Sequence, residues 1–147
     1  MTVLYADSSA LASAYLDDEP EHRALRDLLL GGDHHVVSSE VARLELASAM
    51  RSADRAGRLL DVDELLRWID IDSREGGPIQ LLELEPRRTL AIAHRLLLEH
   101  PLRIMDAIHL AVALEDAAEI AGGEEIVLVT RDADQAAAAR AHGLAVR

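Results

Sequence analysis

The sequence of 147 residues contains no cysteine and no lysine, and its 15 basic residues are all arginines. The absence of cysteine excludes a disulfide framework, a thiol nucleophile and a cysteine-ligated zinc site. The absence of lysine excludes Schiff-base chemistry, a Walker A lysine on a phosphate, and the lysine of a phospho-accepting response regulator. Any catalytic chemistry must therefore come from other side chains.

Long apolar runs are also missing from the chain. The longest stretch without a charged side chain is 8–16, nine residues, whereas a membrane-spanning helix needs roughly 20. The N-terminus lacks a basic leader and carries Asp7 early, which argues against a signal peptide. Together with the lack of cysteine, this leads us to expect a cytoplasmic protein with no membrane contact.

The charge balance is strongly acidic, with 27 acidic residues against 15 basic ones and a net charge of −12. A chain this acidic is a poor general binder of polyanions, so a nucleic-acid role must rest on local arginines or on metal ions. Half of the residues are apolar, which is enough for a core, and the length fits a single domain over 1–147.

Short apolar strands alternate with helices along the chain. We expect strands at 2–6, 35–38, 79–84, 125–130 and 144–146. Helices are expected at about 8–16, 20–30, 39–57, 62–71, 86–99, 104–121 and 133–143. Ser8 or Ser9 would cap the first of these helices and Ser39 the third, and Trp68 is expected in the core rather than as an anchor for a partner. The alternation predicts an α/β fold with a parallel five-stranded sheet covered on both sides.

Four acidic residues lie where such a fold forms its sites, beyond the carboxyl ends of the strands. Asp7 follows the first strand, and Asp132 follows the apolar strand that ends at Thr130. Asp106 falls near the start of the helix after Pro101, and Glu45 lies within the helix that Ser39 opens. Two unit charges 4 Å apart cost about 4 kcal/mol at an effective dielectric near 20, so such a cluster must hold protons or a cation. Oxygen ligands favour Mg²⁺ or Mn²⁺. A bound Mg²⁺ with an activated water suits phosphodiester hydrolysis.

Four segments carry a resemblance to a known family. They are YADSSAL (5–11), SSEVARLEL (38–46), MDAIHLA (105–111) and VTRDADQAAAARAHGLAV (129–146). In this order they resemble the successive motifs of PIN-domain proteins. Their spacing and the chain length are similar to the VapC-type ribonuclease toxins of bacterial toxin–antitoxin pairs.

The resemblance implies a PIN-like three-layer α/β/α fold with a central parallel five-stranded sheet. It implies that Asp7, Glu45, Asp106 and Asp132 hold Mg²⁺ or Mn²⁺, with Asp7 and Asp106 as the first direct ligands, and activate water for RNA cleavage. It also implies a homodimer neutralised by a cognate antitoxin, with DNA contacted only through that antitoxin. In many such pairs the antitoxin tail places a basic side chain near the acidic site.

Several of these residues also have a purely structural interpretation. Asp7 and Asp132 could be helix caps, and Asp106 a first-turn acid that stabilises the helix dipole. Asp134 competes with Asp132 as the fourth acid. Ser9 either binds Asp7 or caps its helix.

Further candidates surround the four acids in the sequence. The hydroxyl of Thr130 either orients a carboxylate or bonds the backbone. His109 shares a helix face with Asp106, and we expect it to be a packed, hydrogen-bonded histidine rather than a metal ligand. Arg43, Arg103 and Arg131 flank the acids, and an arginine fork suits phosphate. They are candidates for substrate contact, with solvated or acid-paired surface arginines as the alternative.

Two other functions compete with that of a metal-dependent endoribonuclease. One is a noncatalytic PIN-like scaffold or antitoxin-binding regulatory module. The other is a small-molecule phosphohydrolase with an aspartate nucleophile, for which Asp7 would be the candidate. Enzymes of the haloacid dehalogenase type usually have a second aspartate two residues on, where this chain has Ser9, and a lysine, which it lacks.

Overall fold

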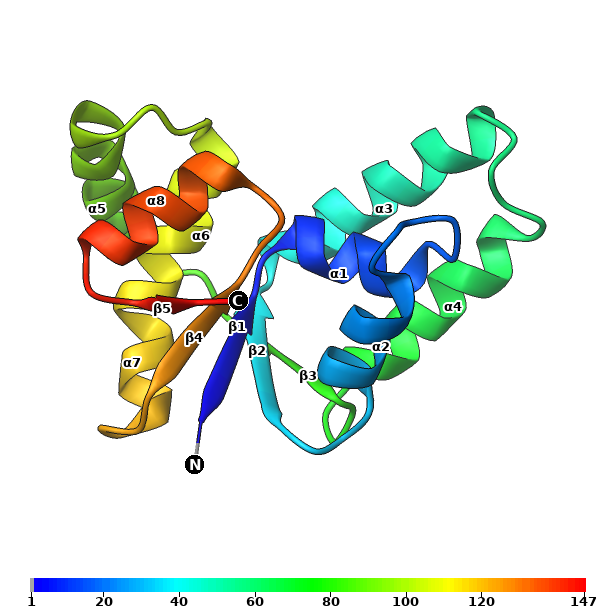
Figure 1. Cartoon of the computed structure of the whole chain (residues 1–147), viewed down its shortest axis with the longest axis horizontal. Helices are drawn as coiled ribbons and strands as arrows, with labels where there is room; N and C mark the ends of the chain where they lie inside the picture. The colour runs from blue at the N-terminus through cyan, green and yellow to red at the C-terminus, as the bar shows by residue number, and fades with distance from the viewer. Residues whose placement is uncertain (1) are drawn as a thin grey trace.

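Five parallel strands form one sheet in the order β3-β2-β1-β4-β5, so that β1 lies at its centre (Figure 1). The computed structural model describes residues 2–147. The strands are β1 (Val3–Ala6), β2 (His35–Ser39), β3 (Ile79–Leu82), β4 (Ile126–Val129) and β5 (Ala145–Val146). The helices are α1 (Ser8–Tyr15), α2 (His22–Leu30), α3 (Val41–Arg55), α4 (Val62–Asp72), α5 (Pro86–Glu99), α6 (Ile104–Leu114), α7 (Asp116–Ala121) and α8 (Ala133–Ala141). The predicted α/β class with a parallel five-stranded sheet is confirmed.

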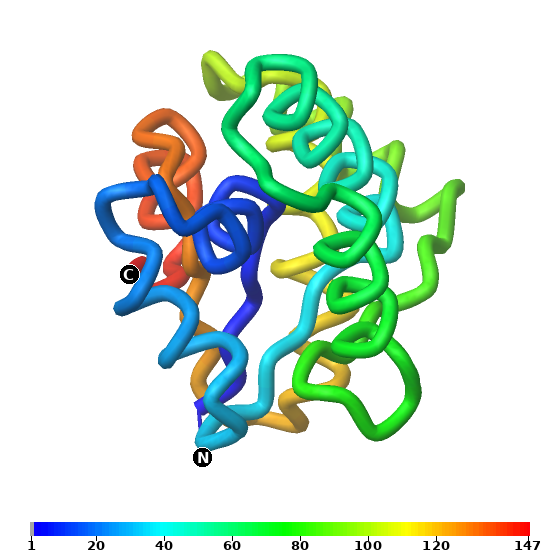
Figure 2. The backbone as a smooth tube through the Cα atoms, turned by 90° about the vertical axis from the view of Figure 1, so that its right-hand side faces the viewer, coloured from blue at the N-terminus to red at the C-terminus, as the bar shows by residue number. Residues whose placement is uncertain are grey.

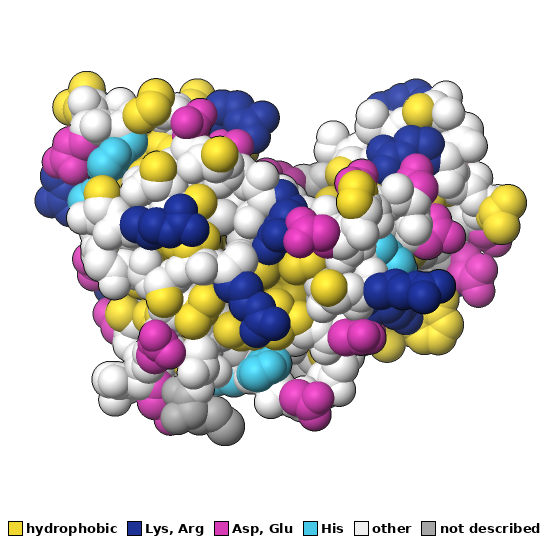
Figure 3. Space-filling model, viewed as in Figure 1, with side chains coloured by type: hydrophobic (Ala, Val, Ile, Leu, Met, Phe, Trp, Pro, Cys, Tyr) yellow, Lys and Arg dark blue, Asp and Glu magenta, His cyan; other side chains and the backbone are white. Residues whose placement is uncertain are grey.

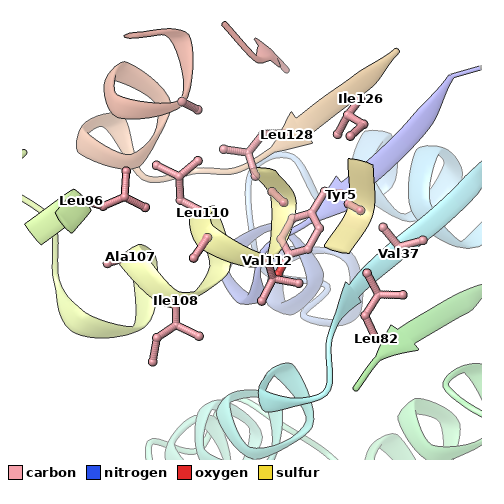
Figure 4. Close-up of a cluster of buried hydrophobic side chains, with 14 of the residues drawn as sticks. Tyr5, Val37, Leu82, Leu96, Ala107, Ile108, Leu110, Val112, Ile126 and Leu128 are labelled. Atoms are coloured by element: carbon pink, nitrogen blue, oxygen red, sulfur yellow. The ribbon is translucent and has the colours of Figure 1, made fainter. Parts of the chain in front are cut away.

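Helices cover both faces of the sheet, because side chains along each strand alternate between its two faces. Val3 and Tyr5 pack on the face covered by α5 to α8, whereas Leu4 and Ala6 pack on the face covered by α1 to α4. The turned view places α1 to α4 nearer the viewer, in front of the strands (Figure 2). The core on the other face has Tyr5 beside side chains of α6 (Figure 4). The result is a three-layer arrangement.

The carboxyl ends of the three central strands meet at one edge of the sheet. Tyr5 of β1 pairs with Val37 of β2 and with Leu128 of β4. The backbone N–H of Asp7 continues this pattern by donating to the carbonyl of Val129 at 3.1 Å. Residues that follow β1, β2 and β4 therefore emerge side by side. In the space-filling view the surface is hollowed between the two groups of helices (Figure 3).

The predicted helix caps are wrong by one residue at two helices. Asp7, not Ser8 or Ser9, caps α1, because its side chain accepts the N–H of Ala10. The N-cap of α3 is Glu40 rather than Ser39. Ser39 is held in β2 by its pairing with Leu82 of β3, and it only accepts the N–H of Val41 at 3.3 Å.

The single helix predicted over 104–121 is two helices in the structure. The chain bends at Glu115, whose φ of −110° and ψ of −68° depart from helical geometry, and α7 then begins at Asp116. Arg88 of α5 forms ion pairs with Asp116 and Glu119 on this second helix. No proline or glycine marks the bend in the sequence.

Two further predictions needed correction. Trp68 is 53% exposed on α4 rather than buried in the core. Strands β3 and β4 are also shorter than the predicted 79–84 and 125–130. In the described part of the chain, no helix combines the length and the apolar character that crossing a membrane requires.

Candidate active site

Asp7 lies at the carboxyl end of the central strand and is 1% exposed. Its Oδ1 accepts the backbone N–H of Ala10 at 2.9 Å. The Ser9 hydroxyl donates to the carboxylate at 2.7 Å from Oδ1, and the Thr130 hydroxyl donates to Oδ2 at 2.7 Å. Donors to both oxygens fix the orientation of the carboxylate. Asp7 is therefore both a helix cap and a rigidly held acid.

Asp106 and Asp132 share one arginine. Asp132 caps α8 with Oδ1, which accepts the N–H of Gln135 at 2.7 Å. Its Oδ2 accepts from the Arg103 guanidinium at 3.1 Å, and the same guanidinium donates to Oδ2 of Asp106 at 3.0 Å. The Arg103 side chain is 79% exposed. A positive charge thus already lies between two of the four acids.

Two buried side chains tie these acids to a common frame. The Thr130 hydroxyl that donates to Asp7 also accepts the N–H of Asp132 at 3.0 Å. The Gln135 amide donates to the backbone carbonyl of Asp106 at 3.1 Å. The ends of β1 and β4 and the start of α6 are therefore joined by direct hydrogen bonds.

Glu45 reaches the same edge from α3. Its Oε2 accepts from the hydroxyl of Ser8 at 2.8 Å, and its Oε1 is hydrogen-bonded to Nε2 of His109. The other ring nitrogen of His109 lies 2.8 Å from the hydroxyl of Tyr5, in the core. The structure thus places His109 as a buried, hydrogen-bonded side chain next to Glu45 rather than next to Asp106.

An open groove runs between α1, α3 and the start of α6. Its volume is about 1140 Å³, and its polar lining includes Ser8, Ser9, Glu45, Arg103 and Asp106. Apolar side chains of α3, of α6 and of the segment before α6 form much of the rest of the wall. Two of the four acids therefore face a space that is large enough for an extended ligand.

The ionisation of Glu45 and that of Asp106 are shifted in opposite directions. Burial raises the pKa of Asp106, and the negative charge of Asp132 adds to this, so that the hydrogen bond from Arg103 does not bring it back to its usual value. Burial also pushes the pKa of Glu45 upwards, but the hydrogen bonds and charges of His109, Ser8 and Arg103 together outweigh it and lower that pKa. The positive charge of Arg103 is thus too small to offset the burial of Asp106 and the negative charge of Asp132.

The donor chemistry of this site fits a hard divalent cation. It offers carboxylate and hydroxyl oxygens, which are the ligands of Mg²⁺ and Mn²⁺. A cation near Asp106 would offset the burial and the negative charge of Asp132 that raise the pKa of Asp106. The four carboxylates are not gathered tightly, however: among residues 2–147, the group of three candidate ligands with atoms within 4.8 Å of one another is Glu99, His100 and His142.

The other predicted site residues lie at different distances from the acids. Of the three arginines, Arg103 alone has a guanidinium that contacts any of the four acids within the described chain. Arg43 pairs with Asp70 of α4, and the Arg131 guanidinium binds Glu21 and the carbonyl of Arg147. Asp134 is exposed in the first turn of α8. The role of the three arginines in substrate contact stays a prediction, and so does the choice between Asp132 and Asp134 as the fourth acid.

Ser8 and Gln135 were not foreseen as members of the site. Gln135 stands three residues after Asp132, which is the spacing of a capping box, so its proximity to Asp132 could have been found in the sequence. Its contact with Asp106 could not, because it depends on how α6 packs against α8. Ser8 gave no signal beyond its position next to Asp7.

Comparison with known protein families gives one match. The family model for the PIN domain matches residues 4–141, a range that includes all four acids. No curated protein matches the chain.

The two hydrogen bonds of the Thr130 hydroxyl lead to a first prediction, which concerns the stability of the fold. Thr130→Val should lower the free energy of unfolding by about 1–3 kcal/mol, because Asp7 loses a donor and the N–H of Asp132 loses its acceptor in a buried place. Urea unfolding followed by circular dichroism measures this loss.

The matched control is Thr89→Val on α5. Thr89 is 1% exposed, and its hydroxyl has no hydrogen-bond partner within the described chain. The control should change the stability by less than about 0.5 kcal/mol or raise it. Equal losses in the two variants would show that the Thr130 hydroxyl does not support the acids.

The pKa of Glu45 is lowered and that of Asp106 is raised, so replacing each acid by its amide should change the stability of the fold in opposite directions. Both effects are measured in EDTA at pH 7. The lowered pKa of Glu45 means that its ionised form stabilises the fold, so Glu45→Gln should destabilise the protein, and the difference should vanish as the pH falls below 4.5. The raised pKa of Asp106 means that its ionised form costs stability above that pKa. Asp106→Asn should therefore stabilise the protein at pH 7, and the gain should vanish below pH 3.8.

Urea unfolding of the two variants and the wild type between pH 3 and pH 7 tests this pair. The helix-dipole contribution of an acid in the first turn of α6 opposes the gain in Asp106→Asn, and we expect burial to outweigh it. A shift of the same sign in both variants at pH 7 would contradict the electrostatic description of the site.

Proposed function

This chain belongs to the PIN domain family, and on that premise we propose that it is a metal-dependent endoribonuclease. PIN domains are in general nucleases, which hydrolyse phosphodiester bonds. The observation that carries the proposal is the joining of Asp7, Asp106 and Asp132 at one sheet edge through Thr130 and Arg103. A fourth carboxylate, Glu45, lines the same groove as Asp106.

The metal would be held by the four carboxylates. Asp7 and Asp106 are the first candidates for direct ligands, and Glu45 and Asp132 would bind directly or through water. When bound, Mg²⁺ or Mn²⁺ supplies an activated water and stabilises negative charge on the phosphate. The raised pKa of Asp106 and the arginine already seated between Asp106 and Asp132 support a cation at this place.

The side chains of this protein would orient the reactants. Ser9 and Thr130 fix the carboxylate of Asp7 from two sides. Glu45, held by Ser8 and His109, stays ionised at neutral pH because its pKa is lowered, so it can accept a hydrogen bond from a water in the groove. Arg103 is exposed and has the fork geometry that binds phosphate oxygens.

We further propose that the enzyme is the toxin of a VapBC-type toxin–antitoxin pair, a cytoplasmic homodimer neutralised by a cognate antitoxin. The order and the spacing of the motifs support this role. A second support is that Asp106 and Asp132 accept an arginine from their own chain, so the same carboxylates are suited to a basic side chain offered by an antitoxin. The net charge of −12 disfavours indiscriminate RNA binding.

One observation favours an alternative, a noncatalytic PIN-like module. The four carboxylates do not bring three ligand atoms within 4.8 Å of one another among the described residues. The phosphohydrolase with Asp7 as a nucleophile is disfavoured, because the chain has Ser9 at the position of the second aspartate and contains no lysine.

The nuclease proposal predicts that purified protein, freed of any partner, cleaves RNA with Mg²⁺ or Mn²⁺ and stops with EDTA. Asp7→Asn should reduce cleavage by at least about 100-fold, since losses at outer-shell residues of metal sites already reach 10–100-fold. Asparagine is as good an N-cap as aspartate, so α1 should remain intact. The measurement is cleavage of a pool of RNA sequences, with circular dichroism as the check of folding.

Asp54→Asn, an exposed carboxylate on α3, is the matched control and should cleave as the wild type does. Cleavage that survives Asp7→Asn or EDTA would remove the metal-dependent mechanism. Hydrolysis of a small phosphate ester without action on RNA would favour the phosphohydrolase, and a folded protein inert on both would favour the noncatalytic module.

The toxin role predicts an effect on growing cells. Induced expression of the wild-type chain in a bacterium should arrest growth, whereas Asp7→Asn should not, because the arrest requires RNA cleavage. Coexpression of the small reading frame expected next to this gene should restore growth. Arrest of equal strength by both proteins would separate toxicity from the acidic site and contradict the role.

A further inference from the structure

Two histidines and a glutamate meet where α5 and α8 end. Nε2 of His100 lies 3.0 Å from Nε2 of His142, and Oε2 of Glu99 lies 4.0 and 3.6 Å from these two nitrogens. The two rings stand nearly edge to face, with an interplanar angle of 70°. Three atoms that commonly bind metals therefore point at one small volume. The space-filling view has histidine and acidic side chains together over the ends of these helices (Figure 3).

The backbone of both helix ends holds these side chains in place. Glu99 is the last residue of α5 and His100 is its C-cap, whose N–H bonds the carbonyl of Leu96 at 2.9 Å. His142 is the C-cap of α8, and its N–H bonds the carbonyl of Ala139 at 3.1 Å. The negative ends of two helix dipoles thus lie beside the three ligand atoms, which favours a bound cation.

The spacing fits a tetrahedral transition-metal ion. With bonds of 2.0–2.1 Å, two ligands of a four-coordinate Zn²⁺ lie roughly 3.3 Å apart, and the three separations here bracket that value. Nitrogen donors from imidazole select Zn²⁺ and its first-row neighbours over Mg²⁺. Without an ion, the short contact between the two imidazoles is explained by a single proton shared between them, and this is the competing explanation.

We propose that Glu99, His100 and His142 form a binding site for Zn²⁺, with the fourth position open to water. The site is distinct from the four carboxylates, because Asp132 and His142 cap opposite ends of α8, which is roughly 14 Å long. Bound Zn²⁺ links the end of α5 to the end of α8. It also holds the start of the segment 100–103, whose last residue is Arg103. The proposal does not depend on nuclease activity.

Cobalt is a suitable probe, because tetrahedral Co²⁺ absorbs strongly in the visible range and Mg²⁺ does not. Untagged full-length protein is titrated with Co²⁺ in excess Mg²⁺, which occupies oxygen-rich sites. We expect one equivalent of a tetrahedral Co²⁺ spectrum that Zn²⁺ displaces. His142→Ala and the surface variant Glu99→Gln should each weaken binding by at least about tenfold, since even outer-shell partners are worth 10–100-fold.

Two matched variants locate the ion. His94→Ala removes an exposed histidine on the same helix α5 and should leave the titration unchanged. Asp7→Asn, in the separate acidic site, should also leave it unchanged. A spectrum that is absent from the wild type, or lost equally in His94→Ala or Asp7→Asn, would overturn the proposal.

Thermal unfolding gives a second readout, which is independent of the cobalt spectrum and can be measured on variants that do not bind the metal. Zn²⁺ at 100-fold excess over its Kd should raise the Tm of the wild type by roughly 5–10 °C, and it should not raise the Tm of His142→Ala. If the two histidines only share a proton, Zn²⁺ leaves both melting points unchanged, and the site is refuted.

Discussion

Repulsion between carboxylates is the constraint that organises the carboxyl edge of this sheet. Acids brought together in a partly buried place must each find positive charge or hydrogen-bond donors. The molecule meets this need in a different way for each acid. Asp7 receives two hydroxyls and a backbone N–H, Asp106 and Asp132 share a guanidinium, and Glu45 is paired with an imidazole. Without lysine, arginine and histidine carry all of the cationic compensation.

The position of the site followed from simple patterns, since the strands of a parallel sheet end at one edge. Asp7 directly follows β1, and Asp132 comes three residues after the end of β4. Their meeting at that edge could be predicted from alternating apolar segments alone. The fold class could be predicted for the same reason. The contacts of Glu45 could not be predicted, because they depend on where α3 crosses α1 and α6. That crossing is set by packing between residues that are far apart in the sequence.

The other differences from prediction have the same origin in tertiary structure. The bend at Glu115 follows no local breaker and coincides with the ion pairs of Arg88 across to α7. Trp68 precedes buried Ile69 on α4, but its side chain is on an exposed part of the helix surface. Its apolar character alone therefore led to the wrong prediction. Arg103 was one of three equivalent candidates in sequence, and only the packing of α6 against α8 singled it out.

The four acids are divided between the two helical layers. Asp7 and Glu45 belong to the side of α1 and α3, whereas Asp106 and Asp132 open α6 and α8 on the other side. The proposed ligand set therefore lies across the boundary between the two helical layers. A shear of the α1–α4 layer along the sheet would change the contact of Glu45 with His109, whereas Asp7 and Asp132 stay joined through Thr130. A protein bound to the outer surface of that layer would then change the affinity of the proposed ligand set for a metal ion through Glu45.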